Sequence, residues 1–550
     1  MQVPSRDSRL AGLAAVAVVA VVASTVVLAA RALLAERQTV DDVFIFLRYA
    51  RNLAAHGQYA FNVAPSGPAV LAPTPVEGTS SVAWTVALAL AWGAGWRGLG
   101  AAKAMSLAVG LLVPATCALA VRRAGGASGT PHPLLVAIPA LALALDADFA
   151  TWAVSGMDTA LWTLACVACV ALAGSPRAAA VLLGLLAWVR PEGPLFAAAG
   201  VLALAHDRRS LLRLAILAAV PVAALTVLRA AYFHDLVPNT FWAKMNAVGG
   251  KDYTGLGYVA SALLRRPLLL LVLPVAALLP SAFPFPLPVP VFASLPSPAR
   301  VALALLLASF FFALLAGGDW MPDRRLLVVA LPLGAILAAF ALARARPAFA
   351  ALACFVLVAE AALTCDHALD QTWRANEWLD ERVTTWRPVA RPFATPYPLD
   401  WMPTHLLHDI APYVAPGDVV AHVDVGELPY VMGDVAFLDG FGLVDREAGR
   451  LAFSPRDPAL RAAAREAFFS AHPAAAIVVV DEGTGHPFSP AQAAALEDAR
   501  FTAGWRELSR VPTWGGHPCV TYVQRSATPV PEAVAAARVR DWLAGEPDVR

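Results

Sequence analysis

Two adjacent carboxylates, Asp41 and Asp42, follow the first long apolar segment of the chain. Residues 11–30 hold no charged side chain, and the aspartate pair comes shortly after them. A carboxylate beside a membrane is costly to keep, and such residues commonly serve binding or catalysis. An ionised carboxylate can act as a general base on a hydroxyl group. Asp41 and Asp42 are therefore the first candidate catalytic residues.

A helix is predicted directly after the pair. Apolar side chains recur with helical spacing over residues 43–55, while Arg48 and Arg51 fall on another side. This pattern predicts an amphipathic helix on the membrane surface. The positive end of its dipole would keep the aspartates ionised. Simple capping by Asp42 is the alternative, but an N-cap needs only one acid.

Four further polar clusters are predicted at the outer ends of apolar segments. Charged side chains at such depth face a cavity or pair with one another. Arginine and lysine can hold a phosphate group, and acids, amides and aromatic rings beside them can orient sugars. The clusters supply the candidate phosphate ligands Arg190, Lys244, Arg324 and Arg325, and the candidate substrate-binding residues Asp158, Glu192, His234, Asn239, Asp319 and Trp320.

Simpler interpretations stay open for several of these residues. Asp158 can equally be a helix N-cap, and Arg190 with Glu192 can form a purely structural pair. A lone loop histidine such as His234 is usually just solvated. No HExxH or GxSxG motif occurs, and no residue is assigned as a metal ligand.

The elements that must position these residues are mostly apolar helices. Of the 550 residues, 59% are hydrophobic and 15% charged, and the mean hydropathy is +0.62. Soluble proteins carry about 25% charged residues, so the composition predicts a polytopic membrane protein. A net charge of +1 provides no positive potential that would attract nucleic acid. The expected spans are 11–34, 101–121, 131–147, 157–174, 178–189, 195–206, 211–230, 267–283, 299–316, 326–343 and 347–365, of which the pair flanking Arg190 is short enough for half-depth helices.

Basic loops indicate how the chain is oriented. If residues 80–95 form an interfacial helix and not a span, most basic clusters fall on the side of the N-terminus. The positive-inside rule makes that side cytoplasmic and places the candidate residues on the outer side. Two arginine pairs fall on the outer side and are exceptions to this rule: Arg265 with Arg266, and Arg324 with Arg325. The first pair has no acid nearby in sequence, which favours a lipid headgroup as its partner.

The composition changes near residue 366, where long apolar runs end. We therefore expect a membrane domain at 1–365 and a soluble α/β domain at 366–550 on the outer side. Its strand-like runs lie at 418–425, 435–439 and 474–482, and a helical stretch lies at 459–469.

The order of these motifs resembles the GT-C superfamily of integral membrane glycosyltransferases, and most closely the terminal arabinofuranosyltransferases of bacterial cell walls. The resemblance extends from about residue 36 to 450, with gaps in the apolar spans. Two features depart from the pattern: Asp158 stands where glutamate is expected, and the loop at 63–76 is longer. The resemblance is carried by DDVFIFLRYARNLAAHGQYAFN, VEGTSSVAW, SGMDTALWT, RPEGPLF, HDLVPNTFWAK, GGDWMPDRR and VDVGELPYVMGDVAFLDGFGLVDREAGR.

This resemblance implies about 11 spans, interfacial helices in the first outer loop and a C-terminal α/β periplasmic domain. It places the chain in the bacterial inner membrane with a cytoplasmic N-terminus. It implies inverting transfer of an arabinofuranose-like or other sugar from a polyprenyl-phosphate donor to a glycan or lipid acceptor of the cell envelope. Asp41 would be the base and Asp42 its neighbour. No cofactor is required, although a divalent cation bound by the aspartates and the lipid phosphate stays open.

Two other classes of protein remain alternatives. A lipid or sugar transporter or flippase also places charges among membrane helices, and Glu360 inside the last expected span suits that class. The halves of the chain show no internal repeat, however, and the acids gather at one face. A non-catalytic scaffold of envelope assembly would tolerate the loss of Asp41 or Asp42.

Overall fold

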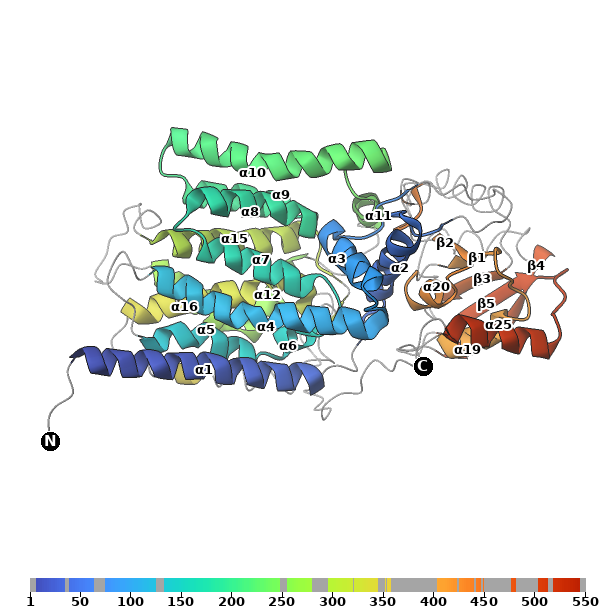
Figure 1. Ribbon diagram of the computed structural model, residues 1–550, viewed down its shortest axis with the longest axis horizontal. Helices are drawn as coiled ribbons and strands as arrows, with labels where there is room; N and C mark the ends of the chain where they lie inside the picture. Colours follow the sequence, from blue (N-terminus) through green and yellow to red (C-terminus); the bar gives the residue numbers. More distant parts are fainter. Residues whose placement is uncertain are drawn as a thin grey trace. The chain divides into compact units, whose positions relative to one another are not determined.

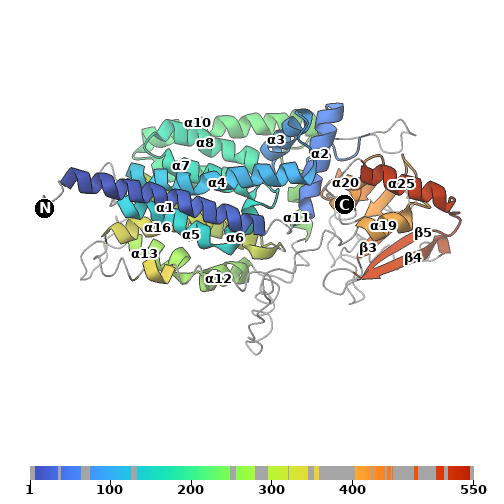
Figure 2. The same ribbon diagram turned by 60° about the horizontal axis from the view of Figure 1, so that its bottom comes forward.

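The computed structural model shows where these elements lie (Figures 1 and 2). It describes residues 6–34, 39–63, 75–124, 133–247, 255–278, 295–319, 321–344, 352, 354–357, 403–422, 425–439, 442–446, 449, 476–480, 503–512 and 518–544. The chain divides into two compact units. The helical unit contains Met1–Glu36, Lys103–Leu225 and Asp252–Thr395, and the mixed unit contains Arg37–Ala102, Thr226–Lys251 and Pro396–Arg550.

Apolar helices dominate the described chain. In lipid every backbone N–H and C=O must be bonded within the protein, and a helix achieves this within one segment. Among the described residues, five helices are long and apolar enough to cross a membrane, or seven if two bent helix pairs each count as one span. The chain is a multi-pass membrane protein. The five are Leu13–Leu33, Gly98–Arg123, Arg208–Phe233, Ser297–Leu315 and Arg324–Ala343.

The expected spans up to residue 343 each overlap a described helix, whereas 347–365 lies almost entirely outside the described residues. Helices α8 (Pro176–Val189) and α9 (Gly193–Leu204) have 14 and 12 residues. A full span needs about 20, so the prediction of short helices around Arg190 is confirmed. The other helices of this part are α1 (Arg6–Leu34), α4 (Gly98–Ala124), α5 (Pro133–Leu145), α6 (Ala147–Ala153), α7 (Thr159–Ala171), α10 (Arg208–Leu228), α12 (Gly255–Arg265), η4 (Leu268–Val272), α13 (Leu273–Leu278), α15 (Ser297–Leu315), η5 (Pro322–Leu327) and α16 (Ala330–Arg344).

Close packing holds the helical unit together. Helix α15 packs against α7, α9 and α16, and α1 packs against α5; Figure 1 shows these helices running side by side. Small residues allow backbones to approach closely in such bundles. A β-carbon on Gly184 of α8 would overlap the backbone of Ala218 in α10. By contrast, α1 exposes Val18, Val19 and Val22, as expected for a face turned to lipid.

A five-stranded sheet lies in the mixed unit, with the order β2-β1-β3-β5-β4. Strand β1 pairs in parallel with β2 and β3. Strand β5 pairs antiparallel with both β3 and β4. The three strand-like runs of the sequence are confirmed as strands, while 459–469 and the boundary at 365/366 lie outside the described residues. The strands are β1 (Val419–His422), β2 (Ala436–Asp439), β3 (Ala476–Val480), β4 (Trp505–Pro512) and β5 (Pro518–Gln524), and the neighbouring helices are α19 (Pro403–Ile410), α20 (Glu427–Val431) and α25 (Glu532–Ala544).

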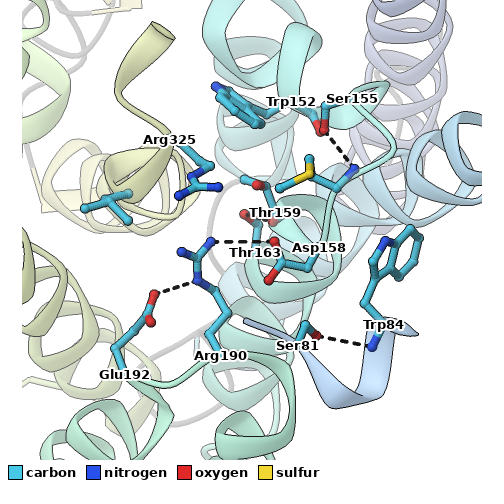
Figure 3. A network of polar contacts seen from close by, with 12 residues as sticks. Ser81, Trp84, Trp152, Ser155, Asp158, Thr159, Thr163, Arg190, Glu192 and Arg325 are labelled. Carbon is cyan, nitrogen blue, oxygen red and sulfur yellow. Dashed lines mark hydrogen bonds and ion pairs between the residues drawn. The ribbon is translucent and has the colours of Figure 1, made fainter. Parts of the chain in front are cut away.

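The mixed unit also contains the segment that follows α1 in sequence. Helix α2 (Asp42–His56) ends at Gly57, whose positive φ of 68° suits glycine. Helix α3 (Val82–Gly93) has 12 residues, too few for a span, which agrees with an interfacial helix. Ser81 caps it, because its side chain accepts a hydrogen bond of 3.2 Å from the N–H of Trp84 (Figure 3). Two shorter helices follow later, η2 (Arg229–Phe233) and α11 (Asn239–Ala247).

Candidate active site

Asp41 lies directly before α2, at its N-cap position, but its side chain makes no capping hydrogen bond. Its Oδ1 instead accepts a hydrogen bond of 2.8 Å from the backbone N–H of Glu427, at the start of α20. The preceding residue must be glycine for this approach, because a β-carbon on Gly426 would overlap the Asp41 carboxylate. Capping by Asp42 is therefore the wrong explanation for the pair, since α2 begins at Asp42 itself.

A second carboxyl group accompanies Asp41. The Glu427 side chain is buried, and its Oε1 has no hydrogen-bond partner among the described residues. Burial, and then the nearby charge of Asp41, raise the pKa of Glu427 to about 9. Two neighbouring carboxyl groups, one of them buried, resist ionising together, so one of them keeps its proton near neutral pH. The sequence analysis missed Glu427 because 386 positions separate it from Asp41.

Helix α2 is fixed by Arg48. Its guanidinium donates hydrogen bonds to the carbonyls of Phe61 (2.8 Å), Val435 (2.9 Å) and Pro429. It also lies over the rings of Phe61 and Phe437, at 4.5 and 5.4 Å from their centroids. The prediction that Arg48 lies on an exposed polar face of α2 is therefore wrong, because this residue is only 2% exposed. Its buried bonds hold the helix that begins beside Asp41.

Two further contacts brace the mixed unit. Glu77 forms two hydrogen bonds of 2.7 Å with Arg229, and burial nevertheless raises the pKa of Glu77. The side-chain amide of Asn239 donates to the carbonyls of Gly442 (2.7 Å), Leu443 (3.0 Å) and Asp445 (2.9 Å). Asn239 is a candidate substrate ligand, but its Nδ2 group already donates hydrogen bonds within the protein. His234, by contrast, is exposed, with a left-handed φ of 53°.

Replacing Asn239 with alanine is expected to lower the free energy of unfolding by about 1–3 kcal/mol, because buried carbonyls lose their donor. The matched control is Leu236→Ala, whose side chain is 63% exposed and should change stability by less than about 0.5 kcal/mol. Thermal unfolding of the purified protein in detergent measures both. Equal melting temperatures for the two variants would show that the Asn239 side-chain amide does not stabilise the fold.

In the helical unit, Arg190 lies between two acids (Figure 3). Its Nε is 2.6 Å from Glu192 Oε1, and its Nη1 is 3.8 Å from Asp158 Oδ1. All three side chains are at most 5% exposed. Asp158 stands at the N-cap position of α7, as one interpretation expected, but its side chain makes no capping hydrogen bond. The break between α8 and α9 therefore carries a buried cation with two carboxylates, as both open interpretations allowed.

A second group of ion pairs joins two helix breaks. The α5–α6 pair bends by 76° and the α12–η4 pair by 103°. Arg266, at the second break, binds Asp146 at 2.6 Å and Asp148 at 2.8 Å, and Arg265 lies 3.6 Å from Asp148. The headgroup interpretation of this arginine pair missed these partners, which are about 120 residues away in sequence.

Arg324 and Arg325 differ in their partners. Arg325 binds Asp319 at 2.8 Å and lies 6.0 Å from the ring centroid of Trp152. Arg324 donates through Nε to Ser261 Oγ at 2.8 Å, and its Nη1 is buried with no hydrogen-bond partner among the described residues. No ion pair joins it to a described carboxylate, and its φ of 49° is rare for a residue with a side chain. Arg324 is therefore a buried guanidinium that still offers a donor to an anion.

Two candidate residues cannot be placed: the Lys244 side chain and Trp320 lie outside the described residues. Within the described ranges, no three His, Cys, Asp or Glu side chains gather in a way that could hold a metal ion. The divalent cation considered for the aspartate pair thus has no third such protein ligand there.

No protein family model and no curated protein matches the sequence. Two solved structures are similar. The crystal structure of ArnT from Cupriavidus metallidurans bound to undecaprenyl phosphate shares 13% identity, covers 94% of this chain and 98% of its own, and gives a TM-score of 0.47. The apo oligosaccharyltransferase of Archaeoglobus fulgidus shares 13% identity, covers 75% and 64%, and gives 0.40. Both TM-scores lie below 0.5.

Proposed function

We propose that this chain is a glycosyltransferase of the GT-C type, which moves a sugar from a polyprenyl-phosphate donor to a hydroxyl group of an envelope glycan or glycolipid. The observation that carries this proposal is the carboxylate of Asp41. It is turned away from helix capping and held by the backbone N–H of Glu427. A hydrogen bond to the charged form of a carboxyl group favours ionisation, and an ionised carboxylate is what a hydroxyl nucleophile needs as its base.

The reaction follows from this role. Asp41 takes the proton of the acceptor hydroxyl, and the acceptor oxygen forms a bond to the anomeric carbon of the donor. The bond between that carbon and the phosphate oxygen breaks, and its electron pair leaves with polyprenyl phosphate. Attack on the face opposite the leaving group inverts the anomeric configuration. The leaving group is already an anion, so it needs charge neutralisation more than a proton.

Arg324 supports the use of a phosphate-linked donor. It combines near-complete burial with a donor nitrogen that has no partner among the described residues. Arginine recognises phosphate through such N–H groups. Arg190 and Arg325 are already paired with carboxylates, so we assign them a secondary role in phosphate binding. The resemblance of the motifs further suggests a pentose such as arabinofuranose as the sugar and the periplasmic face of the inner membrane as the location.

Replacing Arg324 with glutamine is expected to raise the KM for the donor by about 10-fold or more, because a charge-assisted hydrogen bond to the phosphate contributes about 1.5–3 kcal/mol. Stability should change little, since the variant removes a buried charge that forms no ion pair with a described carboxylate. Arg209→Gln, at an exposed position of α10, is the matched control. An unchanged KM for the donor would show that Arg324 does not bind the donor phosphate.

A donor screen tests the function as a whole. Membranes that contain the chain would receive a panel of polyprenyl-phosphate sugars labelled in the sugar, with membranes lacking it as the control. We expect label from at least one donor to enter an acceptor glycan or lipid. Passage of intact donor across the bilayer without bond cleavage would favour the transporter or flippase. No effect of the chain on either process would favour the scaffold.

A further inference from the structure

We propose that Glu427 is a positioning residue for the base, a neutral carboxylic acid that leaves the single negative charge of this carboxyl pair on Asp41. This inference rests on the proposed function and adds to it a residue from the α/β region of the chain. It assigns the two carboxyl groups different states, which the resemblance to glycosyltransferases does not.

Within the mixed unit, the backbone of Glu427 lies directly against the Asp41 carboxylate. The backbone N–H of Glu427 donates to Asp41 Oδ1 at 2.8 Å, and Gly426 lets the carboxylate approach the chain at this point. The Glu427 side chain is 7% exposed, and its Oε1 is buried with no hydrogen-bond partner among the described residues. A charged carboxylate in such a place would lack solvation.

The neighbouring cations do not neutralise Glu427. Helix α2 brings two arginines to α20, but Arg48 donates to the Pro429 carbonyl and Arg51 to the Tyr430 carbonyl at 3.0 Å. No ion pair joins Glu427 to a described cation. Besides Asp41 and Glu427, the titratable and charged side chains on the described parts of α2, α19 and α20 are Asp42, Arg48, Tyr49, Arg51, His56, His408, Asp409 and Tyr430.

The local charges decide which group keeps the proton. Burial and the charge of Asp41 together raise the pKa of Glu427 to about 9, so this group is neutral at pH 7. Asp41 holds the charge, since it receives the backbone N–H and lies at the positive end of the α2 dipole. Above about pH 9 Glu427 loses its proton. The second negative charge then repels Asp41, so the rate of transfer should fall as the pH rises through this value.

Glu427→Gln tests this assignment because glutamine keeps the shape and a hydrogen-bond donor but cannot ionise. The assay uses the purified full chain in nanodiscs with radiolabelled polyprenyl-phosphate arabinose as the first probe. We expect the variant to keep its rate at pH 7 within about 3-fold and to lose the decline near pH 9. Glu427→Ala should lose about 10-fold or more at pH 7, a loss of about 1.4 kcal/mol in transition-state stabilisation. Glu532→Gln, at an exposed position of α25, should keep the wild-type profile.

An alkaline decline that persists unchanged in Glu427→Gln would overturn the inference. An infrared pH titration keeps the test independent of activity. The wild type should show a protonated carboxyl band at pH 7 that disappears near pH 9 and is absent in Glu427→Gln. If no probe is transferred but this band is present, the proposed function fails and the state of Glu427 stands. If transfer occurs but the band is missing, the inference about Glu427 fails and the function stands.

Discussion

Asp41→Asn is expected to lower the rate of sugar transfer by about 10²–10⁴-fold, the range typical for the loss of a general base. Asparagine has nearly the same volume, and its Oδ1 can still accept the hydrogen bond from Glu427 N–H. It cannot take a proton from the acceptor hydroxyl. The variant should therefore fold, keep the wild-type melting temperature and bind the donor, while the chemical step fails.

Asp42→Asn is the matched control for this prediction. Asp42 is the first residue of α2 and lies next to Asp41 in the chain. If Asp41 alone is the base, the control should change the rate by less than about 10-fold, a difference below 1.4 kcal/mol. Rates measured with saturating donor separate chemistry from binding. A larger loss in Asp42→Asn than in Asp41→Asn would exchange the roles of the two aspartates.

Gly426→Ala is expected to cost about 100-fold or more in rate, although it adds only one methyl group. The added β-carbon would occupy the space of the Asp41 carboxylate, so either the carboxylate or the start of α20 must move. A misplacement of about 1 Å in a catalytic group can cost 10²-fold. Gly504→Ala is the matched control, because a β-carbon there meets no atom within 4 Å.

The kinetic parameters distinguish this effect from general damage. We expect Gly426→Ala to lower kcat while the KM for the donor and the melting temperature change little. Full activity of Gly426→Ala would show that catalysis does not depend on the present position of Asp41 or on its hydrogen bond to the N–H of Glu427.

Local patterns in the sequence located most of the fold. Uncharged runs such as residues 11–30 predict helices because a helix satisfies its backbone hydrogen bonds within one segment in lipid, and α1 confirms this. The buried runs that became β1, β2 and β3 were also found. Strands β4 and β5 were missed: β4 carries Arg506, Glu507 and Arg510, and such a polar segment becomes a strand through its pairing with β5, which a local pattern does not contain.

The candidate site was predicted only in part, for the same reason. Asp41 stands out in sequence because a carboxyl pair follows an apolar run. Glu427 does not, because its significance comes from a neighbour 386 positions away. The partners of Arg266 were hidden by a separation of 120 positions. The burial of Arg48 was missed because its helical pattern was interpreted against a membrane surface, whereas protein carbonyls surround its guanidinium.

The role of Asp41 as the base can be tested by following both products of the transfer reaction. Purified wild-type chain and Asp41→Asn would be given a donor identified by the screen, labelled in both sugar and lipid, together with the acceptor. Released polyprenyl phosphate and transferred sugar would be quantified in the same reaction. We predict equal amounts of the two products for the wild type, and a loss of both by at least about 100-fold for Asp41→Asn. Equal product formation by the two proteins would contradict the role of Asp41 as the base.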